Sequence, residues 1–336
     1  MGNSENTPLV SILVITYNQE ATVGRAIESV LAQTCSFPYE IIIGEDCSAD
    51  STPAVCRSYA ERYPDKIRLI ANTSNKGLID NYYDCLLEAK GKYIADCAGD
   101  DYWTDPHRLQ RQVEFMEAHS DVTLVHSGWK FEDSETHEIS EPAPRAGKFE
   151  WRLPIIDGKE LLVPFIAGEE SPIPIVVLSA AIFRRDVFLK AYREDTSLFR
   201  NKEYRCEDVP VTAAMMYAGK IAFLPGSVMN YSVGHSSLSS NENYAKTFDF
   251  YFGVLKLKLR LIAKYGLEGV LDEPSFRHGV HYLVAQAFLS ESKERMDAIL
   301  GLVKANGLKL TAKGKIYRLL SRTRPLWRCA AKSISN

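Results

Sequence analysis

The chain has 336 residues, of which 46% are hydrophobic and 25% are charged, and its formal net charge is −3. This composition is that of a globular protein with room for one large domain and an extension, and the weak acidity argues against a nucleic-acid partner. Seven cysteines without a C-x-x-C pair indicate reduced thiols and a cytoplasmic protein. The polar start of the chain and the lack of a long apolar run predict neither a leader nor a spanning helix.

The first 130 residues alternate between apolar segments and amphipathic segments. We expect strands at 9–16, 39–46, 66–72, 91–98 and 121–127, with helices at 20–34, 51–63, 77–89 and 105–119. Such alternation with short connections predicts an α/β fold, in which helices cover both faces of a mostly parallel sheet. Ligands of these sheets bind at the carboxyl ends of the strands.

Beyond residue 130 the alternation stops. Prolines and charges predict loops with short elements over 131–175, followed by a strand that runs into a helix at 175–188. A helix is expected at 206–220 and one or two short strands within 221–234, and from about residue 244 the pattern is helical. These changes divide the chain into a sheet domain at 1–240, a helical extension at 241–303 and a tail at 304–336.

The tail at 304–336 contains nine Lys and Arg residues and no acid. Apolar residues are interleaved with these bases, namely Ile316, Leu319, Leu320, Leu326 and Trp327. This composition is typical of a helix that lies on an anionic membrane surface, and the alternative is a solvated tail. We therefore expect a cytoplasmic protein that the tail holds peripherally on the inner face of the membrane.

Polar side chains follow each of the first strands. They are Tyr17 and Asn18, Glu45 and Asp46, Asn72 to Asn75, and Gly99, Asp100 and Asp101. Because the carboxyl ends of parallel strands share one edge of a sheet, these residues should line one crevice. Its acidic rim indicates a metal ion or a hydrogen-bonding sugar.

Four segments occur in a characteristic order: "PLVSILVITYNQEATVGRAIESVLAQT", "EIIIGEDCSADST", "NKGLIDNYYDCLLEAKGKYIADCAGDDYWTDPHRLQRQVEFME" and "CEDVPV". Over residues 8–240 the chain resembles the inverting glycosyltransferases of family 2, with the GT-A fold, and especially bacterial members that build surface polysaccharides. The resemblance implies a nucleotide-sugar donor, usually a UDP-sugar, a divalent metal (Mn²⁺ or Mg²⁺), and a glycan acceptor, which can be lipid-linked. It also implies direct displacement with inversion.

The resemblance assigns roles to individual residues. On the donor side, the family's motifs match a donor-binding loop at Thr16, Tyr17 and Asn18, a uracil-binding acid at Asp46 and a nucleotide segment at Asn75 and Gly77. The motifs also match a metal-binding acid at Asp100 and a catalytic base at Asp208. Asp101 is the expected second metal ligand, and Glu207 is expected to orient the acceptor. The chain departs from the family at Ala98, where most relatives have an acid, so Asp96 is a candidate substitute.

Each of these assignments has a chemical basis and a structural alternative. The carboxylate of Asp46 can accept from the ring N–H of uracil or thymine, although Asp46 could merely cap the next helix. Asp100 and Asp101 provide the oxygen ligands that a hard cation prefers. Asp208 begins a helix, whose N-terminus is expected to keep it ionised as a general base, and the alternative is plain helix capping.

Two further residues each have two interpretations. Trp103 could stack on a sugar or pack in the core, and His235 could contact phosphate or metal or be an ordinary loop histidine. Three rival functions remain: a nucleotide-sugar-binding or scaffold protein with lapsed catalysis, suggested by Ala98, a nucleotidyltransferase, and a dehydrogenase. The last two are disfavoured because neither an Arg-containing Gly-rich loop nor G-x-G-x-x-G follows the first strand.

Overall fold

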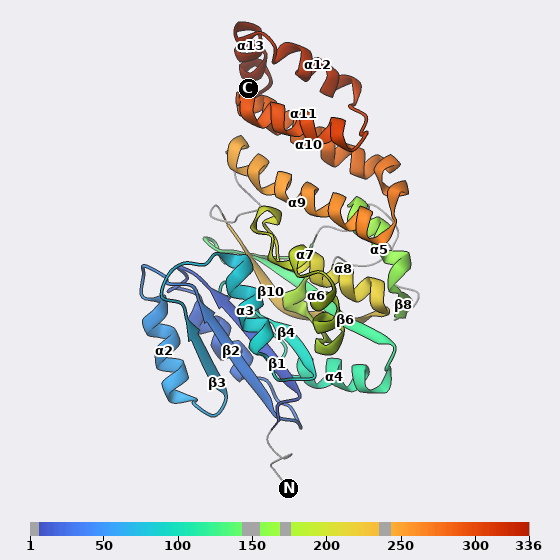
Figure 1. The fold of residues 1–336 in the computed structure, drawn as a ribbon. Helices are drawn as coiled ribbons and strands as arrows, with labels where there is room; N and C mark the ends of the chain where they lie inside the picture. Colours follow the sequence, from blue (N-terminus) through green and yellow to red (C-terminus); the bar gives the residue numbers. More distant parts are fainter. Residues whose placement is uncertain (1–6, 143–154, 169–175, 235–242, 336) are drawn as a thin grey trace. The chain divides into compact units, whose positions relative to one another are not determined.

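The computed structural model describes residues 7–142, 155–168, 176–234 and 243–335. The chain forms two compact units (Figure 1). The first comprises Met1–Leu162, Ser171–Lys202 and Cys206–Val233, and the second comprises Val163–Glu170, Glu203–Arg205 and Gly234–Asn336. Residues 304–336 belong to the second unit together with the helical residues before them.

A single sheet forms the centre of the first unit. Its strands are β1 (Val10–Thr16), β2 (Tyr39–Glu45), β3 (Ile67–Ala71), β4 (Tyr93–Asp96), β5 (Tyr102–Trp103), β6 (Val122–Asp133), β7 (Ile139–Ser140), β8 (Ile155–Asp157), β9 (Ala181–Arg184) and β10 (Lys220–Val233). The order along the sheet is β3-β2-β1-β4-β9-β6-β10-β5, with β7 paired to β6 and β8 paired to β10.

The sheet is mixed, and its longest pairings are parallel. β1 pairs in parallel with β2 and β4, β2 with β3, and β6 with β10. The short strand β9 lies between β4 and β6 and is antiparallel to both. The first four expected strands therefore form one parallel set, β1 to β4. The antiparallel position of β9 between β4 and β6 was not predicted.

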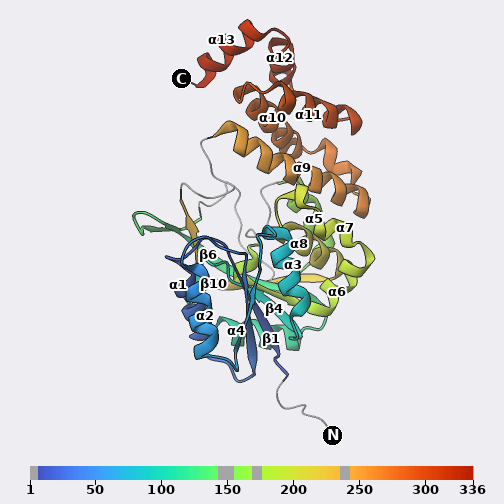
Figure 2. The same cartoon turned by 60° about the vertical axis from the view of Figure 1, so that its left-hand side comes forward.

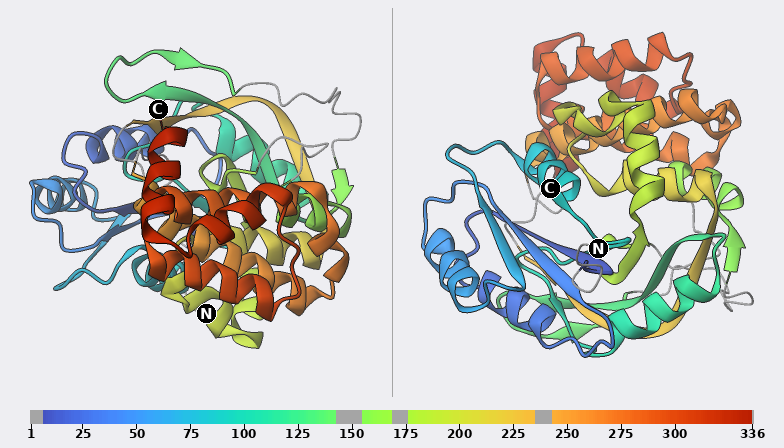
Figure 3. Two further views of the ribbon diagram at one scale, coloured as in Figure 1. Left: turned by 90° about the horizontal axis from the view of Figure 1, so that it is seen from above. Right: turned by 60° about the horizontal axis from the view of Figure 1, so that its bottom comes forward.

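Helices cover both faces of this sheet. The helices of the first unit are α1 (Val23–Leu31), α2 (Thr52–Arg62), α3 (Leu78–Glu88), α4 (Arg108–Ala118), α6 (Arg185–Glu194), α7 (Thr196–Arg200) and α8 (Asp208–Ala218), and α5 (Gly158–Ala167) includes residues of both units. Figure 3 shows α1, α2 and α4 on one face, with α3, α6 and α8 on the other. β1 is buried along almost its whole length, as expected for a strand covered on both sides.

The strands β6 and β10 pair in parallel from Lys220 to Val233 (Figure 2). The sequence predicted one or two short strands within 221–234, but β10 is one strand of 14 residues. Its pairing with β6 changes register between Leu224 and Ser227, so the intervening Pro225 and Gly226 are accommodated as an irregularity.

The second unit contains the helices α9 (Tyr244–Tyr265), α10 (Pro274–Leu289), α11 (Lys293–Ala305), α12 (Ala312–Leu320) and α13 (Arg324–Ser335). The helix α10 contacts each of the other four. Tyr317 and Trp327 are buried, their rings stack on Phe288, and the Trp327 indole donates to the Phe288 carbonyl at 2.7 Å. Trp327 therefore fixes α13 to α10. The sequence pattern placed Trp327 among the membrane-facing residues, but the structure buries its side chain.

Candidate functional site

The loops after β1 and β2 are joined by hydrogen bonds. The Asn18 backbone N–H donates to the Ser48 hydroxyl at 2.9 Å, and its side-chain oxygen accepts from the Ala49 N–H at 2.9 Å. Asn18 and Cys47 both adopt left-handed backbone conformations, with φ of 52° and 59°. Thr16 is buried at the end of β1, whereas Tyr17 is 47% exposed beside it. The expected donor-binding loop therefore has a fixed backbone and one exposed aromatic ring.

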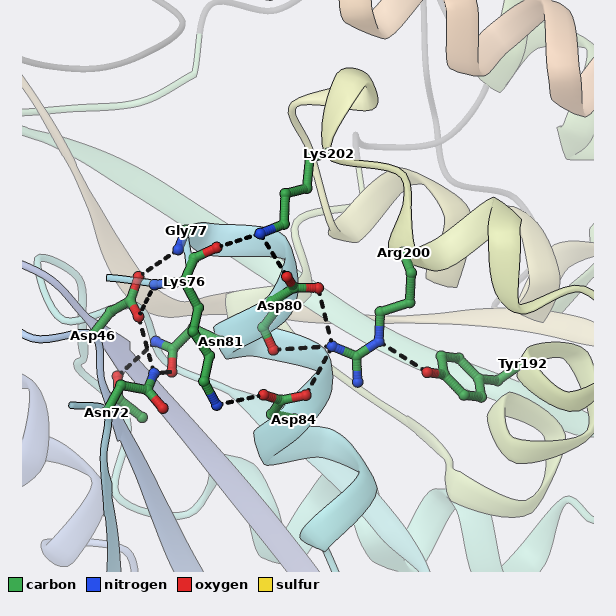
Figure 4. Close-up of polar contacts among 11 residues, drawn as sticks. Asp46, Asn72, Lys76, Gly77, Asp80, Asn81, Asp84, Tyr192, Arg200 and Lys202 are labelled. Carbon is green, nitrogen blue, oxygen red and sulfur yellow. Dashed lines mark hydrogen bonds and ion pairs between the residues drawn. The ribbon is translucent and has the colours of Figure 1, made fainter. Parts of the chain in front are cut away.

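Asp46 is buried directly after β2 and organises the loop that follows β3 (Figure 4). Its carboxylate accepts from the Asn72 side-chain amide at 2.9 Å, the Lys76 N–H at 2.9 Å and the Gly77 N–H at 2.8 Å. Gly77 precedes α3 with φ of 85°, and Asn75 is exposed. A carboxylate has about four acceptor positions, so Asp46 retains capacity for one further donor.

A network of ion pairs fixes this loop from the other side (Figure 4). The Lys202 ammonium donates to the Lys76 carbonyl at 2.8 Å and pairs with Asp80 at 2.6 Å. Arg200 pairs with Asp84 at 2.8 Å and with Asp80 at 3.3 Å. Nothing in the sequence singled out Arg200 or Lys202, because their partners lie on α3, more than 100 residues earlier.

Asp100 and Asp101 lie in the loop after β4, and this loop contacts the end of β1. The Gly99 N–H donates to the Ile15 carbonyl at 3.0 Å, and a Cβ at Gly99 would lie 2.8 Å from the Thr16 hydroxyl oxygen. A side chain at Gly99 would therefore push these loops apart. Asp101 is buried, and its carboxylate accepts from the Ser232 N–H at 3.0 Å.

The electrostatics of this pair fit a divalent cation. Burial raises the pKa of Asp100, and burial together with the charge of Asp100 raises the pKa of Asp101 to about 8. Within the described residues, Asp101 Oδ2 is buried without a hydrogen-bond partner. The described ranges contain no cluster of three His, Cys, Asp or Glu ligands, but Mg²⁺ often takes only one or two carboxylates and completes its shell with phosphates and water.

Glu207 and Asp208 begin α8. The Asp208 carboxylate accepts from the Val209 N–H at 2.8 Å, and the Glu207 carbonyl accepts from the Tyr83 hydroxyl at 2.7 Å. Burial raises the pKa of Asp208, and burial together with the charge of Asp208 raises the pKa of Glu207 to about 8. The helix N-terminus was expected to keep Asp208 ionised. Desolvation opposes that effect and raises the pKa of the Asp208 carboxyl.

Asp96 faces the Glu207–Asp208 pair. It is buried, accepts from the Tyr82 hydroxyl at 2.9 Å, and burial raises its pKa to about 7. The charge of Asp208 also raises this pKa, while Asp100 does not contribute to it. Asp96 therefore interacts electrostatically with Asp208 at the start of α8.

Tyr231 on β10 interacts electrostatically with both acidic pairs, although no sequence motif singled it out. Burial raises its pKa, and the carboxylates of Asp101, Asp100, Asp208 and Glu207 raise it further. All four acids therefore act on one phenol hydroxyl. The expected metal-binding pair and the expected base therefore both lie within electrostatic range of the Tyr231 hydroxyl.

The remaining two expected residues are Trp103 and His235. Trp103 is 4% exposed, its indole N–H donates to the Ser179 carbonyl at 3.1 Å, and the Arg108 guanidinium lies 3.9 Å from its ring centre. These contacts favour core packing over sugar stacking, because the ring is covered by protein. His235 lies outside the described residues.

Two solved structures resemble this chain along most of its length. TarS of S. aureus, in complex with UDP-GlcNAc, covers 96% of this chain and 87% of its own, with a TM-score of 0.57 and 16% identity. The mannosyltransferase PcManGT from Pyrobaculum calidifontis, in complex with GDP-Man and Mn²⁺, covers 98% of this chain and 87% of its own, with a TM-score of 0.51 and 17% identity. Likeness at these identities shows the fold, and it confirms the expected α/β, GT-A-like architecture.

Sequence relatives agree with this fold. The succinoglycan biosynthesis protein ExoO of Rhizobium meliloti is 25% identical over 300 residues, which cover 85% of this chain and 77% of that protein. An uncharacterized protein of Mycobacterium tuberculosis is 44% identical over 115 residues, so the chain spans about a third of its length. The model of glycosyl transferase family 2 matches residues 11–190, more than half of the chain. This chain belongs to glycosyl transferase family 2.

Proposed function

We propose that this protein is an inverting glycosyltransferase that moves a sugar from a nucleotide donor, most simply a UDP-sugar, to a hydroxyl of a growing cell-surface glycan. One observation carries the proposal: hydrogen bonds join the loops after β1, β2, β3 and β4, and the acids of the β4 loop and of the start of α8 act on the same Tyr231 hydroxyl. The nucleotide-sugar complexes of the structural neighbours and the polysaccharide relative support this assignment.

The donor's nucleotide binds at the loops after β1 to β3. Asp46 has one acceptor position left for the ring N–H of uracil, and the exposed Tyr17 and Asn75 lie in the flanking loops. The hydrogen bonds from Lys76 and Gly77 hold the Asp46 carboxylate in place. Lys202 and Arg200 fix the same loop, so the nucleotide binds to a preorganised surface.

Asp208 is the general base in the proposed reaction. It accepts the proton of the acceptor hydroxyl while that oxygen attacks the anomeric carbon, and the bond to the diphosphate breaks on the opposite side of the sugar. Its raised pKa makes it a stronger base once it is deprotonated. Glu207, whose pKa is also raised, orients the acceptor beside it.

Asp100 and Asp101 would hold a divalent metal ion, Mn²⁺ or Mg²⁺. Such an ion neutralises the charge that develops on the departing diphosphate. Burial raises the pKa of both carboxyls, and the charge of Asp100 raises that of Asp101 further, so a cation between them would be favourable. The Ser232 N–H holds Asp101 in position.

A donor screen by thermal shift tests this proposal. UDP-, dTDP- and GDP-sugars are tested with and without Mn²⁺, and the true donor should raise the melting temperature by mass action. We expect the largest shift with a UDP-sugar in the presence of Mn²⁺. UDP binding that is independent of Mn²⁺, without turnover on any acceptor, would favour the alternative of a binding protein with lapsed catalysis.

The helices α12 and α13 support a peripheral membrane position. Ile316, Leu319 and Leu326 are 54%, 62% and 58% exposed, and exposed bases surround them (Lys313, Lys315, Arg318 and Arg322). Each base near an anionic surface contributes about 1 kcal/mol. Within the described residues, no helix has both the length and the apolarity to cross a membrane.

Vesicle flotation measures this membrane binding. The protein should float with phosphatidylglycerol vesicles and not with phosphatidylcholine vesicles, and added salt should release it. We expect the double variant Ile316→Ser, Leu319→Ser to lose this binding, whereas Ile139→Ser, at an equally exposed site on β7, should retain it. Equal flotation of all three proteins would contradict the proposed role of α12.

A further inference from the structure

Three aromatic side chains from β6 and β10 form an aromatic patch, which we define as Trp129, Phe131 and Tyr231. Trp129 and Phe131 are two residues apart on β6 and share one face of the sheet, and Tyr231 lies opposite Phe131 on β10. The ring centres of Trp129 and Phe131 are 4.7 Å apart. The ring centre of Tyr231 lies 5.9 Å from that of Trp129 and 6.2 Å from that of Phe131. All three side chains are half-buried.

The aromatic patch adjoins the acidic end of the sheet. Tyr231 precedes Ser232, whose N–H donates to the Asp101 carboxylate and whose hydroxyl donates to the Asp100 carbonyl. The carboxylates of Glu207 and Asp208 act on the Tyr231 hydroxyl as well. The patch therefore places flat apolar rings beside the groups that would receive a hydroxyl proton.

The position of the patch in the sheet separates it from the nucleotide. The nucleotide-side loops follow β1, β2 and β3, whereas β6 lies three strands beyond β1 in the order β1-β4-β9-β6. Neighbouring strands are about 4.8 Å apart, so roughly 14 Å separates these halves across the sheet. Asp101 lies on the patch's side of the sheet, because its carboxylate accepts from the Ser232 N–H on β10. A ligand on the patch would therefore lie beside Asp101, in the half of the sheet away from the loops after β2 and β3.

We propose that the aromatic patch binds the acceptor glycan, by contact of its rings with the apolar face of the acceptor's terminal pyranose. This inference rests on the proposed transferase function and names the acceptor side of that site. The C–H groups of a pyranose face match aromatic rings, and its hydroxyls match the neighbouring carboxylates. The ring contact would orient one hydroxyl toward Asp208.

Variants of the patch test this proposal with the full-length protein. Trp129→Leu and Phe131→Leu remove a flat ring but keep an apolar side chain, so the core remains filled. Octyl and methyl glycopyranosides serve as acceptor probes, with the donor found in the thermal-shift screen. Donor hydrolysis, in which water replaces the acceptor, is measured in parallel. Phe115→Leu, which removes a half-buried ring on α4, is the matched control.

We expect each patch variant to raise KM for both kinds of glycoside roughly tenfold, with donor hydrolysis unchanged. Trp129→Phe should restore most of the affinity, and Phe115→Leu should behave as wild type. An unchanged glycoside KM in the patch variants would overturn the inference. So would a loss confined to octyl glycosides, because the patch would then bind the alkyl chain. Absence of donor hydrolysis in the wild type would instead count against the proposed function itself.

Discussion

Asp208→Asn is expected to reduce kcat for sugar transfer by about 10²–10⁴-fold while leaving donor affinity unchanged. The amide cannot accept the proton of the attacking hydroxyl, although it still accepts the Val209 N–H that the carboxylate binds. Release of UDP from the donor in the presence of acceptor measures kcat, and calorimetry measures donor affinity. The melting temperature should change little, since the hydrogen bond at the start of α8 is kept.

The pH dependence gives a second measure of the same residue. A base must be deprotonated to act, and burial raises the pKa of Asp208 and that of Glu207. The rise of the rate with pH should therefore lie above the range of an ordinary aspartate, because the base acts only above its raised pKa. Asp186→Asn is the matched control, because Asp186 is an exposed acid in the first turn of α6. Undiminished turnover in Asp208→Asn would refute the assignment of the base.

Asp46→Asn is expected to remove the preference for uridine over cytidine nucleotides. Uracil offers a ring N–H to the Asp46 carboxylate, whereas cytosine offers only an acceptor at that position. A charge-assisted hydrogen bond contributes about 1.5–3 kcal/mol, so UDP should lose roughly ten- to a hundredfold in affinity. The asparagine amide can donate to cytosine, so CDP should lose less. Calorimetry with both nucleotides gives the ratio of their dissociation constants.

The control for Asp46 must loosen the same loop without removing a contact to the uracil ring. Lys202→Met removes the hydrogen bond to the Lys76 carbonyl and the ion pair with Asp80. We expect it to weaken UDP and CDP by the same factor. If Asp46→Asn also weakens both equally, Asp46 acts only on the loop through its bonds to Asn72, Lys76 and Gly77.

The N-terminal half of the fold was predictable because its signal is local. Each strand from β1 to β4 is a short apolar run and each intervening helix has helical periodicity, so the loops at the strand ends followed directly. Asp46, Asp100 and Asp101 were placed at one edge by topology alone. The strand β10 was underestimated because Pro225 and Gly226 read as an interruption, whereas pairing with β6 continues past them.

Features that depend on distant contacts were not predictable. The hydrogen bond from the Trp103 indole to the Ser179 carbonyl, the docking of Trp327 on Phe288 and the ion pairs of Arg200 each join segments far apart in the chain. The raised pKa of Asp208 depends on burial, which the start of a helix does not reveal. Tyr231 became a candidate only when β10 placed it among four carboxylates.

The stereochemistry of donor cleavage tests the central claim most directly. When the donor is an α-linked UDP-sugar and water replaces the acceptor, proton NMR identifies the first anomer of the free sugar before mutarotation mixes the two forms. A hydroxyl activated by Asp208 that displaces the diphosphate in one step predicts the β anomer as the first product. The α anomer as the first product would contradict a single displacement at this site.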